Sequence, residues 1–239
     1  MGDHAVSYEN LPEEMQNTYT KAYWEGLQKR KFSLAAKRAF DIFVSMILLA
    51  ILSPFLLLLA AAIKLDSKGP VFYRQVRVGK YNQDFRIYKF RTMVQNADQI
   101  GPSITVGHDP RITRVGHLIR KFRLDEVSQL LNVLNGSMSL VGPRPEIRKY
   151  VDIYTPEQMA TLLIRPGITA PASIAFKDED ALLSSCENTD EVYIEKILPP
   201  KMALNLEYMK KISFWKDICI LFQTVIAVFI SKGDSEHAE

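Results

Sequence analysis

The chain has 239 residues, of which 47% are apolar, and this length suits one ordinary domain with attachments. Its 30 lysines and arginines stand against 27 acidic residues, a balance too even for a nucleic-acid-binding protein that depends on bulk charge. Two distant cysteines and four unpaired histidines argue against a disulfide framework and against a Cys- or His-built metal site. The first residues are polar, so we expect no secretory signal.

Residues 11–31 are expected to form a helix. Tyr19, Tyr23 and Trp24 form an aromatic stripe on it, and basic residues 29–31 close it. Aromatic residues beside a basic end are typical of a helix at a membrane interface. An amphipathic helix packed on protein has the same pattern, so both alternatives remain open.

The one long apolar run, residues 39–65, carries no charge between Asp41 and Lys64. Its length matches a bilayer hydrocarbon core of roughly 30 Å at about 1.5 Å per residue. Ser53 and Pro54 interrupt it, and a proline removes a backbone hydrogen bond and bends a helix. Basic residues, which mark the cytoplasmic side, flank both ends. The pattern favours a helix that enters the membrane, breaks at this pair and returns; a kinked transmembrane helix is the alternative.

Two β-rich runs follow, residues 71–78 and 84–90, and Gly79 to Gln83 between them predict a hairpin. Lys89 and Arg91 lie on the same face as Phe85 and Ile87. A face that ends in two cations suits a phosphate, although a solvated sheet edge has the same appearance.

Two helices and a loop are predicted in the middle of the chain. Residues 98–114 contain several glycines and prolines and are expected to form the loop. Helices are expected over residues 113–122 and 125–134, and the second ends at the helix stop signal Asn135-Gly136.

The last third contains two stiff loops and two apolar helical segments. The loops are residues 142–145 and 165–167. Residues 181–208 are expected to be helical with an interruption near Pro199 and Pro200. Residues 213–230 are strongly apolar, which is typical either of a helix at the membrane interface or of a buried core helix.

The strongest candidates for chemistry are Asp125 and Glu126, at the start of the helix predicted over residues 125–134. A helix N-terminus favours phosphate, a carboxylate there can attack phosphorus, and its neighbour can hold Mg2+. Arg120 and Arg123 lie just upstream and can clamp phosphate oxygens, and Gln129 lies one turn on. Acidic residues are also favourable in a first helical turn simply because of the helix dipole.

Two further arginines, Arg144 and Arg165, are held next to prolines. A rigidly presented guanidinium suits bidentate binding of phosphate, although such arginines are also common in exposed turns.

Taken in order, these segments resemble the bacterial sugar transferase family, the monotopic phosphoglycosyl transferases. The similarity covers roughly residues 37–230 and is carried by several uncommon strings. These are Lys37-Arg38-x-Phe40-Asp41, Ser53-Pro54, Lys68 to Phe72, Ile87 to Met93, Asp109 to Gly116, Leu124 to Glu146, Arg165 to Thr169 and Leu204 to Asp217.

The resemblance implies a reaction. Asp125 would attack the β-phosphate of a UDP-sugar, release UMP and carry the phosphosugar covalently to a polyprenyl phosphate, usually undecaprenyl phosphate. Glu126 is associated with Mg2+ in such proteins. The substrate-binding residues expected are Lys89, Arg91, Arg120, Arg123, Gln129, Arg144 and Arg165.

The resemblance also implies an architecture. The expected fold is mostly α with a small β-hairpin: a re-entrant membrane helix broken at Ser53 and Pro54, interfacial helices and a compact cytosolic catalytic domain. The expected divisions are residues 1–36, 37–65 and 66–239. The expected location is the bacterial inner membrane with the catalytic domain on its cytoplasmic face. Membrane lipids are expected partners, nucleic acid is not, and a homodimer is compatible with the sequence.

The sequence departs from its relatives at residues 170–173, where Ala-Pro-Ala-Ser stands in place of Gly-Trp-Ala-Gln, and in an acidic stretch over residues 176–191. Both departures bear on which sugar is bound, so no sugar is assigned. The competing hypotheses are a non-catalytic membrane-surface scaffold, against which the intact Asp125-Glu126 pair argues, and a nucleic-acid-binding protein on a membrane anchor.

Overall fold

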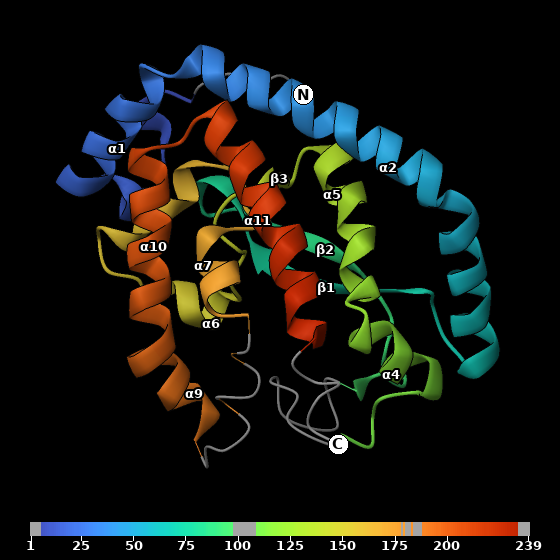
Figure 1. The fold of residues 1–239 in the computed structure, drawn as a ribbon. Coiled ribbons are helices and arrows are strands. Elements are labelled where there is room, and N and C mark those ends of the chain that lie inside the picture. Colours follow the sequence, from blue (N-terminus) through green and yellow to red (C-terminus); the bar gives the residue numbers. More distant parts are fainter. Residues whose placement is uncertain (1–5, 98–108, 178, 180–182, 184–187, 234–239) are drawn as a thin grey trace.

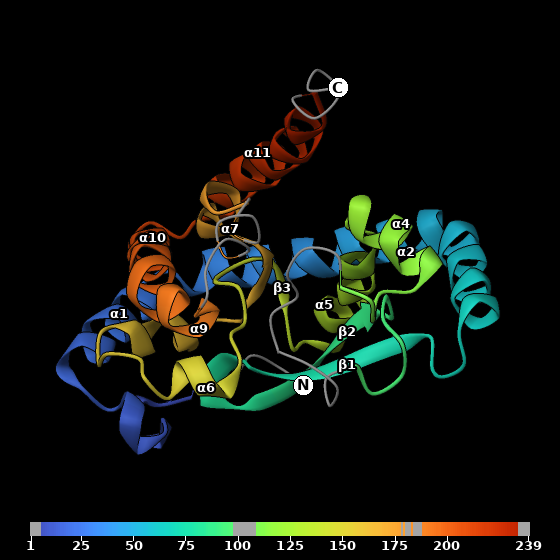
Figure 2. The same ribbon diagram turned by 90° about the horizontal axis from the view of Figure 1, so that it is seen from below.

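A computed structural model describes residues 6–97, 109–177, 179, 183 and 188–233 of the chain. Helices make up most of it, arranged around a small antiparallel hairpin, as the sequence predicts. In Figure 1 the long helix α2 arches over one side of the molecule, and Figure 2 shows the hairpin along one edge with most of the helices on one side of it. Most of the loop expected over residues 98–114 lies outside the described residues.

The N-terminal segment packs on protein. Short 3₁₀ helices, Tyr8–Asn10 and Glu13–Met15, precede α1, Thr18–Gln28. The helix begins later than predicted because the Asn17 side chain caps it, accepting a hydrogen bond from Thr20 N at 2.9 Å. Met15 and Leu27 are buried, and the Tyr23 hydroxyl donates to Glu157 at 3.1 Å. The segment is therefore joined to the body of the protein.

Helix α2, Lys31–Asp66, is long and apolar enough to cross a membrane. Only 11% of its most apolar stretch is buried, unlike the core helix of a soluble protein. Figure 1 shows that its axis turns along its length, and Pro54 lies within the C-terminal half of the helix. Proline has no N–H for the Ala50 carbonyl, and the Ser53 hydroxyl donates to that carbonyl instead at 2.9 Å. The Ser-Pro pair thus bends the helix while keeping this carbonyl satisfied.

The two faces of α2 are inverted relative to a soluble amphipathic helix. Lys37, Asp41 and Ser45 recur every fourth residue and are buried against the protein. Large apolar side chains such as Ile51 and Leu57 are exposed instead, at 68% and 70%. A helix with polar residues inside and apolar residues outside suits an apolar surrounding rather than water.

Both ends of α2 are fastened to the same body. Near its start, the Lys37 ammonium lies 2.5 Å from Asp217 and donates to Val141 O at 2.8 Å. At its end, the Asp66 carboxylate accepts from Val115 N at 3.0 Å, and Arg91 donates to the carbonyl of Ser67 at 2.7 Å. The arch therefore leaves the body and returns to it.

The predicted hairpin is confirmed. Strand β1, Phe72–Val78, pairs antiparallel with β2, Asp84–Phe90, in a register that places Phe72 opposite Phe90. The turn uses positive φ at Tyr81 and Asn82.

A second, parallel pair was not predicted from the sequence: β3, Ser139–Val141, lies beside β4, Gly167–Thr169. Gly142 and Gly167 approach so closely that a side chain on Gly167 would collide with the Gly142 backbone. This pairing brings the two stiff proline-containing loops side by side.

The middle helices depart from the prediction at one point. Helix α4, Arg114–Lys121, is present, but the helix expected over 125–134 is divided into a 3₁₀ helix, Leu124–Gln129, and α5, Leu130–Asn135. Arg123 precedes them in the left-handed region with φ 52°. Short helices α6, Arg148–Val151, and α7, Pro171–Ala175, and the 3₁₀ helix Gln158–Leu163 complete this part.

Near the C-terminus, α9, Thr189–Val192, passes through a π-helical turn, Tyr193–Ile197, into α10, Leu198–Lys210. The turn lies next to Pro199 and Pro200, which lack the N–H groups that would bond preceding carbonyls, so the predicted interruption has this form. Helix α11, Phe214–Gly233, follows and projects from the body in Figure 2. It buries Asp217 and Ile220 but exposes Trp215 and Phe222 at 74% and 67%, so it is not a fully buried core helix.

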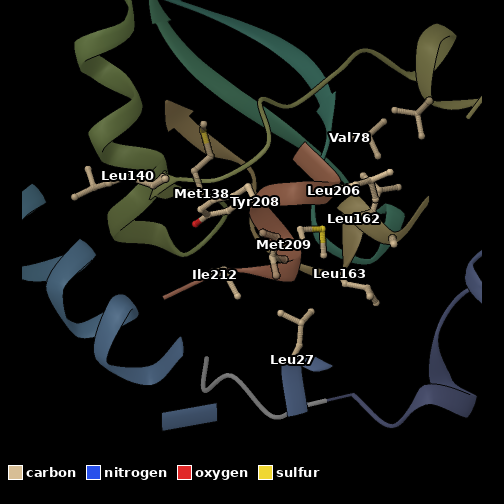
Figure 3. Packing of buried hydrophobic residues seen from close by; sticks show 14 of the residues in the cluster. Leu27, Val78, Met138, Leu140, Leu162, Leu163, Leu206, Tyr208, Met209 and Ile212 are labelled. Carbon is tan, nitrogen blue, oxygen red and sulfur yellow. The ribbon is translucent and has the colours of Figure 1, made fainter. Parts of the chain in front are cut away.

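The main core joins these segments. Figure 3 shows Leu27 of α1 facing Leu163 and Met209, with Tyr208, Leu206, Leu162 and Val78 beside them. Val133, Met138 and Val141 are fully buried in the same cluster. Because the core draws on the hairpin, α5, α10 and the N-terminal segment, these elements form one rigid support for the cavity described next.

Candidate active site

A cavity of about 940 Å³ opens between the hairpin, α4, the 3₁₀ helix Leu124–Gln129, the loop at 144–146 and a wall that includes Ser173, Glu179, Tyr193 and Lys201. Most of the residues predicted from the sequence line it. These are Lys89, Arg91, Arg120, Arg123, Asp125, Glu126 and Arg144.

Asp125 and Glu126 are held in place by hydrogen bonds between their helix and β2. The Ser128 hydroxyl lies 3.1 Å from Asp125 O and 3.0 Å from Tyr88 O. One turn on, the buried Asn132 accepts from Tyr88 N at 2.7 Å and donates to Arg86 O at 3.0 Å. The carboxylates are thus presented from a segment fixed to the strand that carries Lys89.

Two cations surround the two carboxylates. Lys89 Nζ lies 3.9 Å from Asp125 Oδ2 and 3.3 Å from Glu126 Oε1. The Arg144 guanidinium pairs with both carboxylate oxygens of Glu126. Glu126 is therefore held by two cations, whereas Asp125 has the longer contact with Lys89, and the charge of Arg120 acts on it as well.

This asymmetry separates the pKa values of the pair. Burial raises the pKa of Asp125, Lys89 opposes the rise, and the neighbouring Glu126 adds to it. Burial acts in the same direction on Glu126, but Arg144 and Lys89 outweigh it and hold its pKa well below the usual range. Two adjacent carboxyls with opposite shifts are suited to different roles.

Arg120 and Arg123 lie on the same side of the cavity as the pair. Arg120 Nε donates to Thr92 Oγ1 at 3.1 Å, and its charge lowers the pKa of Asp125. Arg123 Nη2 donates to Lys177 O at 2.9 Å. This end of the cavity therefore combines a carboxyl of raised pKa, Asp125, with several guanidinium groups, a composition suited to phosphate.

Three predicted residues are placed differently. Arg91 borders the cavity, but its guanidinium donates to carbonyl oxygens at the end of α2 and just after it, those of Lys68, Ser67 and Ile63 at 2.7, 2.7 and 3.3 Å. Gln129 is buried beneath the surface with 1% exposure. Arg165 is not among the cavity-lining residues, and its Nε donates to Gly136 O at 2.7 Å. Their role in substrate binding remains a prediction.

The sequence did not single out the far wall of the cavity. Glu146, Glu179, Tyr193 and Lys201 line it. Glu146 ends a string that carries the family resemblance, but nothing in the local pattern associates it with residues 47 and 55 positions further on. Such a cluster exists only through tertiary packing.

The donor set suits Mg2+ only in the presence of substrate. No group of three or more His, Cys, Asp or Glu arranged for a metal is found in the part of the chain that the structure describes. Asp125 and Glu126 still supply two adjacent carboxylates, and Mg2+ in nucleotide sites is bound by one or two carboxylates with substrate phosphates. The residues fit that mode and do not form a full cage.

Comparison with known proteins gives consistent matches. Residues 32–231 match the family model described as bacterial sugar transferase. The chain is 41% identical over 200 residues to UDP-N-acetylgalactosamine-undecaprenyl-phosphate N-acetylgalactosaminephosphotransferase of Aeromonas hydrophila. It is 38% identical over 217 residues to undecaprenyl-phosphate glucose phosphotransferase of Komagataeibacter xylinus.

The extent of these matches differs between relatives. The first two cover 82% and 87% of this chain but 44% and 39% of the relatives, so the chain spans less than half of their length. The exopolysaccharide production protein ExoY of Rhizobium meliloti (strain 1021) is 32% identical over 213 residues, which cover 83% of this chain and 87% of that protein.

Proposed function

The chain belongs to the bacterial sugar transferase family, and from this premise we propose that it transfers a sugar 1-phosphate from a UDP-sugar to undecaprenyl phosphate. The names of its relatives support donor and acceptor. The observation that carries the proposal is the pair Asp125 and Glu126 in a cation-lined cavity, with opposite pKa shifts.

Asp125 is the proposed nucleophile. A carboxylate oxygen of Asp125 attacks the β-phosphorus of the donor, the bond from that phosphorus to the bridging oxygen breaks, and UMP leaves with the bonding electrons. A phosphate oxygen of the lipid then attacks the same phosphorus and frees the Asp125 carboxylate. The longer contact of Asp125 with Lys89 leaves this carboxylate more available than Glu126.

The cations around the pair have complementary proposed roles. Lys89 is 3.3 Å from Glu126 and 3.9 Å from Asp125, close enough to neutralise a phosphate oxygen brought between them. Arg120 and Arg123 line the adjoining wall and would stabilise the negative charge on the phosphate of the departing UMP. When bound, Mg2+ would be held by Glu126 with oxygens of the donor phosphates and would neutralise their charge.

We propose that the protein lies at the cytoplasmic face of the inner membrane, and the basic residues that flank both ends of its apolar run support this side. We also propose that α2 is re-entrant, because its inverted faces suit lipid and both its ends are fastened to one body. A helix that crossed the bilayer would separate those ends by the membrane thickness. A re-entrant helix instead places the cavity near the headgroups, where a soluble donor and a lipid phosphate can both arrive.

The test is UMP release by the full chain in detergent, with undecaprenyl phosphate, Mg2+ and a panel of UDP-sugars. We expect release with one or a few sugars and a loss of at least about 10³-fold on Asp125→Asn, since a nucleophile is removed. Arg148→Gln is the matched control, because Arg148 pairs with Asp84 outside the cavity. No UMP release with any sugar would favour the scaffold hypothesis.

A further inference from the structure

The wall of the cavity formed by Glu146, Glu179, Tyr193 and Lys201 is a connected polar cluster. The Tyr193 hydroxyl donates to Glu146 Oε1 at 2.5 Å. Lys201 Nζ donates to Tyr193 Oη at 3.1 Å and to Glu179 Oε2 at 2.9 Å. Glu146, Tyr193 and Lys201 are each more than nine-tenths buried. Their geometry is therefore fixed before any ligand arrives.

A buried ionic cluster of this kind does not favour folding over an apolar replacement. Removing charges from water costs several kcal/mol per ion, and their attraction rarely returns more than that. The ring of Tyr193 belongs to an apolar cluster with Tyr150, Ile197 and Leu198, which shows that this region packs apolar side chains. The polar groups are placed on the side of that cluster that faces the cavity.

Two carboxylate oxygens of the cluster can each accept a further hydrogen bond. Glu146 Oε2 and Glu179 Oε1 accept no hydrogen bond from any residue that the structure describes, whereas their partner oxygens are engaged. Ionised carboxylates are acceptors only, and they bind hydroxyl groups strongly. The wall therefore offers oriented acceptors to hydroxyl donors.

The cluster is electrostatically continuous with the reacting end. Arg144 pairs with Glu126, and the pKa of its guanidinium is raised mainly by Glu126 and further by Glu179 and Glu146. A group that extends from a phosphate beside Asp125 past Arg144 thus reaches the acidic wall. In a UDP-sugar, the transferred sugar is bonded directly to the β-phosphate, whereas the ribose is separated from it by a further phosphate.

We propose that this wall is the subsite for the transferred sugar, with Glu146 and Glu179 accepting hydrogen bonds from hydroxyl groups of a hexose or N-acetylhexosamine and Tyr193 and Lys201 fixing the two carboxylates. The proposal rests on the proposed function, since it assigns a further part of the same donor. It makes these residues determinants of sugar specificity that act on binding rather than on bond breaking.

The test measures binding without turnover, in the full chain carrying Asp125→Asn. Titration calorimetry would compare UDP with the UDP-sugar that the wild type uses. Glu146→Gln or Tyr193→Phe should weaken UDP-sugar binding by about tenfold, the effect of one hydrogen bond to a charged group, and leave UDP binding unchanged. Tyr150→Phe is the control. The Tyr150 hydroxyl also donates to a carboxylate, that of Asp190 at 2.7 Å, but Tyr150 does not line the cavity.

Each other outcome has a definite meaning. Equal losses for UDP and UDP-sugar would place the nucleotide at this wall and overturn the proposal. Unchanged binding of both ligands in two folded variants would overturn it as well. If the Asp125→Asn protein bound UDP but the wild type released UMP from none of the UDP-sugars, the proposed function would fail first, and this subsite with it.

Discussion

Lys89 lies close to Asp125 and Glu126, whose pKa values are shifted in opposite directions. The fall in rate at acid pH therefore reports on the interactions of Asp125. Burial raises the pKa of Asp125, Lys89 lowers it, and Glu126 raises it. A nucleophilic Asp125 acts only when ionised, so the rate should fall as the pH drops through this raised pKa.

Two substitutions should shift the acid limb of the pH-rate profile in opposite directions. Lys89→Gln removes a cation that lowers the pKa of Asp125, so the acid limb of kcat/KM should move to higher pH. Glu126→Gln removes a charge that raises it, so the limb should move to lower pH. Initial rates across the acid range would check both. Movement of both limbs in one direction would contradict the assignment, because the two neighbours carry opposite charge.

Some of the site residues predicted from the sequence line the cavity, and others lie outside it. The strings around Lys89, Asp125 and Arg144 predicted members of one cavity, and the structure places them there. Arg165 lies elsewhere, because its loop pairs with Ser139 and Gly142 through the parallel strands. A three-residue parallel pair gives no periodic signal of its own, so sequence pattern alone did not reveal it.

At the scale of elements, α2 and α11 are joined by a buried ion pair. Lys37 and Asp217 have side-chain exposures of 10% and 4%, and Tyr208 donates to Asp217 at 2.7 Å. Removing Asp217 breaks the closer of two ion pairs of the buried Lys37, which keeps its 3.9 Å contact with Asp41, and it leaves the buried Tyr208 hydroxyl without this acceptor.

Asp217→Ala should therefore lower the free energy of unfolding by about 3–5 kcal/mol, which corresponds to roughly 10 °C or more in Tm. Thermal melting of the purified protein in detergent would measure it. Asp217→Asn, which keeps an acceptor for the Tyr208 hydroxyl, should lose less than Asp217→Ala. Lys211→Met is the control at an exposed pair with Glu207 and should shift the free energy by at most about 0.5 kcal/mol. A loss in the control equal to that of Asp217→Ala would contradict this account.

The sequence predicted the types of the elements better than their ends and their internal geometry. The hairpin, the long apolar helix and the break near Pro199 were predictable, because periodicity and proline act locally. The 3₁₀ geometry of Leu124–Gln129 was not, since it depends on the hydrogen bond of Ser128 to Tyr88 of a distant strand. The start of α1 depended on the cap at Asn17, which the aromatic stripe did not reveal.

At the scale of the whole molecule, the fastening of both ends of α2 predicts its topology in the membrane. Cysteines placed singly at Lys29 and Lys68, which are both exposed, should react with a membrane-impermeant thiol reagent from the same side. The native cysteines would first be replaced by serine. Labelling in inverted vesicles but not in spheroplasts would place both ends in the cytoplasm, whereas labelling from opposite sides would show a spanning helix and contradict re-entry.

The proposed covalent step at Asp125 can be tested in a reaction without lipid acceptor. The wild-type chain would be mixed with its UDP-sugar and Mg2+ without lipid acceptor, and both UMP and the intact protein mass would be measured. We predict up to one UMP per protein and a mass increase equal to one phosphosugar, both absent in Asp125→Asn. Addition of undecaprenyl phosphate should remove the added mass and restart UMP release. Release of UMP only when the acceptor is present, with no mass increase in an active enzyme, would indicate direct transfer and contradict the account.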